Sequence, residues 1–171
     1  MKPTGHKCVA VLMSGGVDSS VSALKIAQQG HDVLGVTLKL FDDEIAESGD
    51  RAAEDAARIC RIIGIPHYVL DLRDIFRRRI IGYFVESYAQ GLTPNPCMLC
   101  NPLIKFGEAF DRCIAMGADM IATGHYVRPA RYLNGLAPAK AADPAKSQEY
   151  FLARLPRAEL ERMIFPVGDM E

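Results

Sequence analysis

The sequence predicts an α/β fold in which an open parallel sheet carries helices on both faces. Four short apolar runs of strand length recur between residues 8 and 124, and stretches with helical periodicity separate them. Glycine or proline marks most of the boundaries, as expected where one element ends and another begins. Strands that alternate with helices in this way form right-handed βαβ units, so we expect a Rossmann-like sheet.

The first strand is expected at residues 8–13, CVAVLM, because a short and almost wholly apolar run is typical of a central strand covered on both faces. A helix follows from residue 17 and ends at Gly30, and its apolar side is expected to consist of Val17, Val21, Leu24 and Ile26. The second strand is expected at residues 32–41, and an acidic loop at 42–50 follows it.

The remaining elements continue this alternation and then depart from it. They are expected, in order, as a helix at 51–64, a strand at 66–72, a helix at 73–91, a helix opened by Pro102 at 102–117 and a strand at 118–124. Asn134-Gly135 signals a hairpin turn, and short helices are expected at 147–155 and 156–165. We divide the chain into a nucleotide-binding domain at 1–130 and a partial extension at 131–171, and expect further domains beyond it.

Composition limits the class of protein. Apolar residues make up 49% and charged residues 24%, and no apolar run reaches the length of a membrane span, so we expect a cytoplasmic protein without membrane contact. Five cysteines and no secretion signal argue against a disulfide framework. The net charge of -1 excludes a globally basic nucleic-acid binder, but residues 124–157 hold six Lys or Arg against Asp143 and Glu149. That segment is either a polyanion-binding face or a solvated surface.

The clearest motif is SGGVDSS, which begins at Ser14 between the first strand and its helix. Gly15 and Gly16 let the main chain approach a phosphate closely. The helix-start amides and the Ser14 and Ser19 hydroxyls supply donors at the positive end of the helix dipole. Asp18 fits this setting if it holds Mg²⁺ beside the phosphates. The motif is neither GxxxxGK[ST] nor GxGxxG, and a plain turn with capping side chains is the alternative.

SGGVDSS resembles the PP-loop, SGGxDS, of ATP pyrophosphatases with the adenine nucleotide alpha-hydrolase-like fold. Four further motifs follow in order: TPNPCMLCNPLIKFG, ADMIATGHYVR, KSQEYFL and FPVGDME. With them the chain resembles the tRNA-specific 2-thiouridylases from Val9 to its last residue. The resemblance implies a tRNA-uridine 2-sulfurtransferase, which adenylates the 2-oxygen of the wobble uridine with ATP and replaces it with persulfide sulfur. It implies tRNA and a persulfide donor protein as partners, and this chain as the ATP-binding N-terminal part.

The resemblance also implies roles for individual residues. The ATP-binding set comprises Leu12, Met13, Ser14, Gly15, Gly16, Val17, Asp18 and Ser19 at the phosphates, Leu38 against the adenine and Gly124 beside the nucleotide. The tRNA-contacting set comprises Asn95, Pro96 and Cys97 at the target base, and Lys146, Ser147 and Gln148 elsewhere on the tRNA. Cys100 is implied as the first catalytic cysteine, and the persulfide-bearing cysteine would lie beyond residue 171, so this fragment should bind ATP but not complete thiolation.

Three side chains near these motifs keep more than one interpretation. We expect the helix dipole to favour the Cys100 thiolate, because this cysteine lies near the start of a helix. His125 is interpreted as an orienting or packing group. Lys105 either offers positive charge to the phosphates or is an ordinary surface lysine.

Two positions depart from the family pattern. Cys97 replaces the aspartate of NPDxxCN and creates a CxxC with Cys100. The pair could hold an iron–sulfur cluster completed by a distant cysteine, act as a redox or persulfide-relaying pair, bind zinc, or simply pack. Ser147 replaces the acidic residue of KDQSYF, which weakens the expectation of tRNA contacts there.

Two other functions remain open for an SGGxDS protein. A PP-loop amidotransferase or synthetase would use ammonia against another adenylated acceptor and would need no cysteine in this loop. A non-catalytic nucleotide-binding module would hold ATP without turnover.

Overall fold

A five-stranded parallel sheet forms the centre of the structure, a computed structural model that describes residues 5–42, 47–133 and 135–171. The strand order is β3-β2-β1-β4-β7. The strands are β1 (Cys8–Leu12), β2 (Asp32–Lys39), β3 (His67–Asp71), β4 (Met120–Ala122) and β7 (Met163–Ile164). The four predicted strands are confirmed, and β1 is central, with residues 9–12 almost wholly inaccessible. The expected helix at 156–165 was wrong at its end, because Met163 and Ile164 pair with β4.

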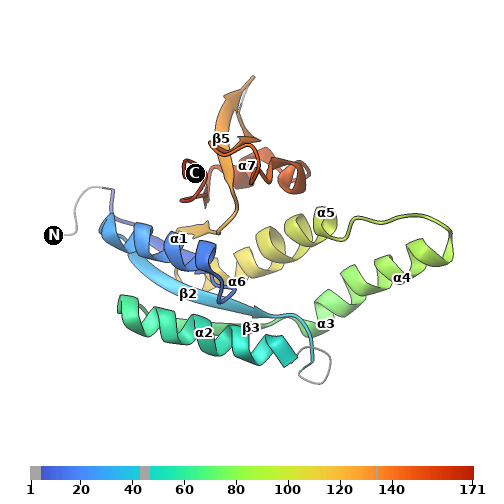
Figure 1. Ribbon diagram of the computed structural model, residues 1–171, viewed down its shortest axis with the longest axis horizontal. Coiled ribbons are helices and arrows are strands. Elements are labelled where there is room, and N and C mark those ends of the chain that lie inside the picture. The colour runs from blue at the N-terminus through green and yellow to red at the C-terminus, as the bar shows by residue number, and fades with distance from the viewer. Residues whose placement is uncertain (1–4, 43–46, 134) are drawn as a thin grey trace.

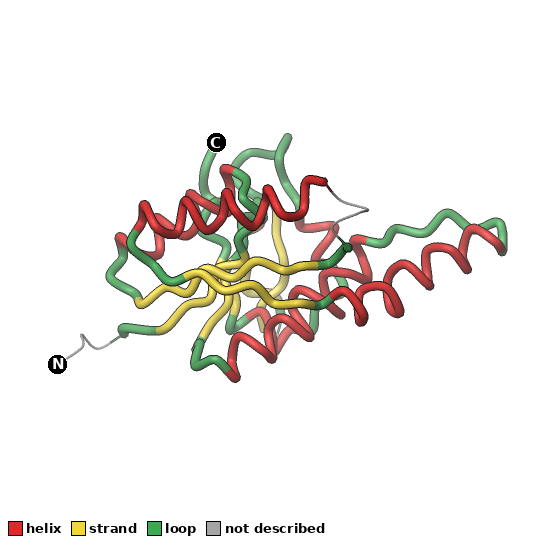
Figure 2. The backbone as a smooth tube through the Cα atoms, turned by 90° about the horizontal axis from the view of Figure 1, so that it is seen from below, coloured by secondary structure: helices red, strands yellow, loops and turns green. Residues whose placement is uncertain are grey.

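Helices cover both faces of the sheet, which confirms the predicted α/β class (Figure 2). On one face, α1 (Val17–Gln28) and α2 (Glu47–Ile63) pack Ile26 and Cys60 against Val9 and Val11. The opposite face is covered by two continuous helices, one formed by α3 (Arg73–Phe76), η1 (Arg77–Ile81) and α4 (Gly82–Ala89), the other by α5 (Cys97–Cys100), η2 (Asn101–Glu108) and α6 (Ala109–Ala115). Figure 1 shows these two helices extending beyond the sheet, where the loop at 90–96 joins them.

Two expectations about the first helices were wrong. Helix α2 begins at Glu47, so the acidic loop expected at 42–50 is shorter, and residues 43–46 lie outside the described part of the chain. In α1, Val17 is 76% exposed and Leu24 is 41% exposed, whereas the buried positions include Ser19, Ser22 and Ala23. Small side chains face inward because α1 lies very close to the chain that follows β4, where the Ser22 hydroxyl donates to the carbonyl oxygen of Thr123 at 3.4 Å.

Pro102 lies inside a helix, although it was expected to open one. The helix starts at Cys97, and residues 101–108 form wide π-helical turns. Proline has no N–H for the i→i−4 bond, and its ring clashes with the carbonyl four residues before, so the helix widens to i→i+5 bonding. Gly107 accommodates the wide turn, because a Cβ there would lie 2.7 Å from the Pro102 carbonyl oxygen.

The segment after β4 packs onto the same core as the sheet. β5 (Val127–Tyr132) and β6 (Gly135–Lys140) form the predicted antiparallel hairpin, although Asn134 itself lies outside the described residues. The short helices η3 (Glu149–Leu152) and α7 (Arg157–Leu160) bury Leu152 and Leu160 in the cluster that contains Phe110. The functional boundary at residue 130 stays a prediction. No helix in the described ranges is long and apolar enough to cross a membrane.

Two glycines in the helical layer should respond oppositely to alanine. Gly107→Ala should lower the free energy of unfolding by about 1 to 3 kcal/mol, because the new methyl group meets the Pro102 carbonyl. Gly82→Ala should raise it by about 0.5 to 1 kcal/mol, since the nearest atom is 3.8 Å away and alanine restricts the unfolded chain. Urea unfolding followed by circular dichroism measures both. Equal effects of the two substitutions would contradict the π-helical geometry.

Candidate functional site

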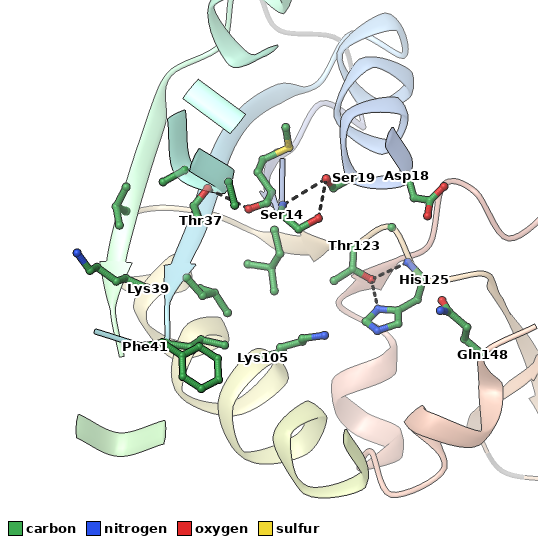
Figure 3. Close-up of a pocket in the computed structure, with 18 residues that line it drawn as sticks. Ser14, Asp18, Ser19, Thr37, Lys39, Phe41, Lys105, Thr123, His125 and Gln148 are labelled. Atoms are coloured by element: carbon green, nitrogen blue, oxygen red, sulfur yellow. Dashed lines mark hydrogen bonds between the residues drawn. The ribbon is translucent and has the colours of Figure 1, made fainter. Parts of the chain in front are cut away.

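A cavity of about 610 Å³ opens at the carboxyl ends of β1, β2 and β4, the usual position of ligands in open parallel sheets (Figure 3). Its wall comes from segments far apart in sequence: the end of β1 with the phosphate loop, β2 and the residues that follow it, α2, β3, the π-helical segment and the chain after β4. The lining residues used below are Leu12, Met13, Ser14, Asp18, Ser19, Leu38, Phe41, Lys105, Gly124, His125 and Gln148. The structure therefore brings much of the predicted ATP-binding set together.

The phosphate loop leaves the first amides of α1 without side-chain partners. Gly16 is the N-cap residue, and no side chain caps the helix. Gly15 has a φ of +77°, in the left-handed region, and a Cβ there would lie 2.7 Å from the Ala52 carbonyl oxygen. The Ser19 hydroxyl donates to the Gly16 carbonyl at 3.0 Å and lies 3.3 Å from the Ser14 hydroxyl. This arrangement favours an anion-binding loop over a turn with capping side chains.

The chain after β4 lies against the start of α1. A Cβ at Gly124 would lie 2.8 Å from the Ser19 amide nitrogen, so only glycine fits without movement. The next residue, His125, shares a 2.8 Å hydrogen bond between its Nδ1 and the Thr123 hydroxyl. Burial lowers the pKa of His125 to about 3, and the Lys105 ammonium adds to the shift. His125 is therefore neutral at physiological pH, and its role as an orienting or packing group stays a prediction.

Asp18 lines the cavity and is held by a tyrosine. The Tyr126 hydroxyl donates to Asp18 Oδ1 at 3.1 Å. Within the described ranges, no group of three or more His, Cys, Asp or Glu side chains could hold a metal ion. Mg²⁺ suits such a site, because it is commonly held by one or two carboxylates together with substrate phosphates and water.

Apolar side chains line the end of the cavity beside β2. Leu38 lies there as predicted for the adenine, and Phe41 and Val69 extend the same wall. Phe41 packs edge-on against Phe76, with ring centroids 5.0 Å apart. Sequence reasoning missed Phe41, although an aromatic residue just beyond a parallel strand is a signal for a ligand wall.

The two cysteines occupy the first turn of the helix that begins at Cys97. Cys97 is exposed and Cys100 is half-buried. Burial raises the pKa of the Cys100 thiol, and the nearby charge of Lys105 opposes this rise. The contribution of the helix dipole stays a prediction. Asn95 caps this turn, with its Oδ1 accepting from the Met98 amide at 3.4 Å. None of Asn95, Pro96, Cys97 and Cys100 lines the cavity, and Cys100 lies five residues before the lining residue Lys105.

The segment Lys146–Gln148 is tied to the chain that follows β4. Gln148 lines the cavity, and its Oε1 accepts from the Tyr126 amide at 3.0 Å. The Lys146 ammonium lies 5.2 Å from the centre of the Tyr126 ring. Tyr126 therefore touches both this segment and Asp18.

Ser147 keeps an acidic partner despite the departure from KDQSYF. Its hydroxyl accepts from the Ala141 amide at 2.9 Å and donates to the Glu149 carboxylate. That hydrogen bond lowers the pKa of Glu149. Relative to KDQSYF, the hydroxyl and the carboxylate have exchanged positions along the chain, and here the two side chains are hydrogen-bonded to each other.

Comparisons with known proteins agree with this geometry. Residues 7–171 match the family model described as "tRNA methyl transferase HUP domain". The chain is 46% identical over 163 residues to tRNA-specific 2-thiouridylase MnmA 1 of Fusobacterium nucleatum subsp. nucleatum, covering 95% of this chain and 42% of that protein. It is 47% identical over 163 residues to the MnmA of Trichlorobacter lovleyi, covering 95% and 46%. The chain thus spans about half the length of these curated relatives.

A solved structure shares the fold. It is the crystal structure of a "predicted subunit of tRNA methyltransferase" from Methanocaldococcus jannaschii, with a TM-score of 0.56 and 17% identity, covering 96% of this chain and 70% of that one. At this identity the likeness shows the fold alone.

Burial of His125 should make stability depend on pH. Its pKa of about 3 lies below the unfolded value of 6.5, so between these values the unfolded chain binds more protons and the free energy of unfolding falls as pH falls. His67, whose pKa burial also lowers, contributes in the same direction. In His125→Asn the loss of stability between pH 7 and pH 5 should be smaller than in the wild type by about 1 to 2 kcal/mol, as measured by urea unfolding. Equal pH dependence in the two proteins would refute a buried, neutral His125.

Proposed function

The chain belongs to the tRNA-specific 2-thiouridylase family as an N-terminal domain of the tRNA methyl transferase HUP type, and from this we propose that it activates a tRNA uridine with ATP. One observation carries the proposal: an uncapped phosphate loop and the helix that begins with the two cysteines contribute to one cavity region. An ATP pyrophosphatase needs the first feature. A sulfurtransferase also needs the second.

The first step places ATP in the cavity. The adenine lies against Leu38, the phosphates lie on the amides of residues 14–19, and Gly124 leaves room beside the nucleotide. Mg²⁺ at Asp18 would neutralise phosphate charge. The uridine O2 attacks the α-phosphorus, the bond from that phosphorus to its β-bridging oxygen breaks, and pyrophosphate leaves while the N3 proton goes to solvent.

The second step replaces the adenylated oxygen with sulfur. The terminal sulfur of a cysteine persulfide attacks C2, the bond between C2 and the adenylated oxygen breaks, and AMP leaves with the former O2. The Cys100 thiolate then attacks the sulfur of that cysteine and releases 2-thiouridine, and a dithiol reductant returns the disulfide to two thiols. The persulfide cysteine and its donor protein lie outside residues 1–171 in this proposal.

The extension at 131–171 would hold the tRNA. One expected tRNA-contacting segment is 146–148, which contacts Tyr126 and Ala141 beside the cavity. The other is 95–97, which leads into the cysteine helix. A bound uridine would have to reach between these two segments.

The chemistry of the cavity favours ATP over a methyl donor, although the family model carries the name methyl transferase. A methyl sulfonium donor has no phosphate that the uncapped amides of α1 could bind. A carboxylate such as Asp18 is favourable in this position if Mg²⁺ lies between it and the phosphates. An ammonia-dependent synthetase remains the competing PP-loop reaction, and the cysteine pair argues against it.

Cys100→Ser should abolish tRNA thiolation in the full-length protein, with a loss of at least about 1,000-fold, because serine cannot accept or release sulfur. ATP affinity should stay within about twofold, since Cys100 lies outside the cavity wall. Thiolation is measured by nucleoside mass spectrometry and ATP affinity by calorimetry. Cys8→Ser, at the opposite end of β1, is the matched control and should keep activity. Wild-type thiolation by Cys100→Ser would remove Cys100 from the mechanism.

Cys97 and Cys100 are proposed to handle sulfur together, either as two ligands of an iron–sulfur cluster or as a persulfide-relaying pair. Within the described ranges no third ligand gathers beside them, so a cluster would take its third cysteine from elsewhere. Full-length protein purified without oxygen should contain iron and acid-labile sulfide if the first alternative holds, and Cys97→Asp should lose both. Active, iron-free protein would leave the persulfide pair.

A further inference from the structure

Lys105 is a half-buried cation in the wall of the cavity, with no ion-pair partner in the part of the chain that the structure describes. Figure 3 shows its side chain directed into the cavity from the helix, facing the phosphate loop and His125. The other charged lining residues are Asp18 at the phosphate loop and Lys39, which interacts electrostatically with the Asp71 carboxylate. Lys105 thus supplies positive charge that no described carboxylate neutralises.

The π-helical segment determines where this ammonium lies relative to the cysteine. In an α-helix, five residues turn through about 500°, which would place Lys105 about 140° away from Cys100 around the axis. In π-helical turns, i→i+5 bonding brings residues five apart close to one above the other. Pro102 and Gly107 therefore rotate Lys105 toward the face of the helix that carries Cys100.

Electrostatic effects agree with this placement. Burial raises the pKa of Cys100 and lowers that of His125; the Lys105 charge opposes the first shift and adds to the second, so the ammonium is near both groups. Because His125 is neutral, it cannot supply the cation that an anionic transition state needs. Lysine suits a position between two anions, since its compact ammonium carries three donors that can point in different directions.

We propose that Lys105 is a catalytic residue of the adenylation step, an inference that rests on the proposed function. Its ammonium donates to a non-bridging α-phosphate oxygen while the bond from uridine O2 to phosphorus forms and the bond to pyrophosphate breaks. It gains and loses no proton in this step.

Two substitutions of Lys105 test this role in the full-length protein. Lys105→Met keeps much of the stem and removes the charge, and it should slow pyrophosphate release in a single turnover with ATP and tRNA by about 100-fold. Lys105→Arg keeps the charge and should recover part of that loss. Lys25→Met, in the last turn of α1 away from the phosphate loop, is the matched control and should release pyrophosphate at the wild-type rate. Release by Lys105→Met within twofold of the wild type would overturn the phosphate role.

Failure of this proposal and failure of the proposed function give different results. Wild-type full-length protein that releases no pyrophosphate would refute the proposed function. An active wild type that Lys105→Met matches would overturn only the role of Lys105.

Discussion

The close approach of Gly124 to the main chain of Asp18 and Ser19 is the constraint on which the candidate site depends. Parallel pairing of β1 with β4 brings the two strand ends together, and the absent side chain lets the chain after β4 cross the start of α1. The hydrogen bond from Tyr126 to Asp18 and the contact from Ser22 to Thr123 require that approach. Without it, the phosphate loop and the segment that carries Gln148 would not share a cavity.

The second organising feature is the proline inside the cysteine helix. Pro102 converts the middle of the helix to π-helical turns. This change rotates Lys105 toward the face of the helix that carries Cys100. The side chain of Asn101 ties the same helix to the extension by donating to the Phe151 carbonyl at 3.0 Å. The cysteine helix and the extension are therefore parts of one packed unit. The proposed reaction would gain from this, because its intermediate must be protected from water.

Sequence patterns predicted the sheet well and the helices less well, for physical reasons. Apolar runs identified β1 to β4, but the two residues of β7 are too short to show periodicity, and only pairing with β4 makes them a strand. Proline at 102 looked like a helix start because a helix interior usually rejects it. The inward face of α1 was misjudged because closeness of packing, not hydrophobicity, selects Ser19 and Ser22 there.

The site could be anticipated only in part. The glycines and serines of SGGVDSS predict a phosphate loop from local chemistry, whereas Gly124 was implied only by the resemblance to the family. By contrast, nothing local to Tyr126 shows that it bonds Asp18, 108 residues earlier. In the sequence, Ser147 looks like the loss of the acidic residue of KDQSYF. In the structure, the Ser147 hydroxyl is hydrogen-bonded to the Glu149 carboxylate two residues later.

Oxygen tracing tests the central claim, adenylation of the uridine, most directly. Full-length protein would be given ATP, a persulfide donor and tRNA whose target uridine carries ¹⁸O at position 2, and the AMP would be examined by mass spectrometry. Adenylation of O2 predicts that one ¹⁸O appears in the phosphate of AMP for each 2-thiouridine formed. Thiolated tRNA accompanied by unlabelled AMP, or by ADP and phosphate, would contradict it.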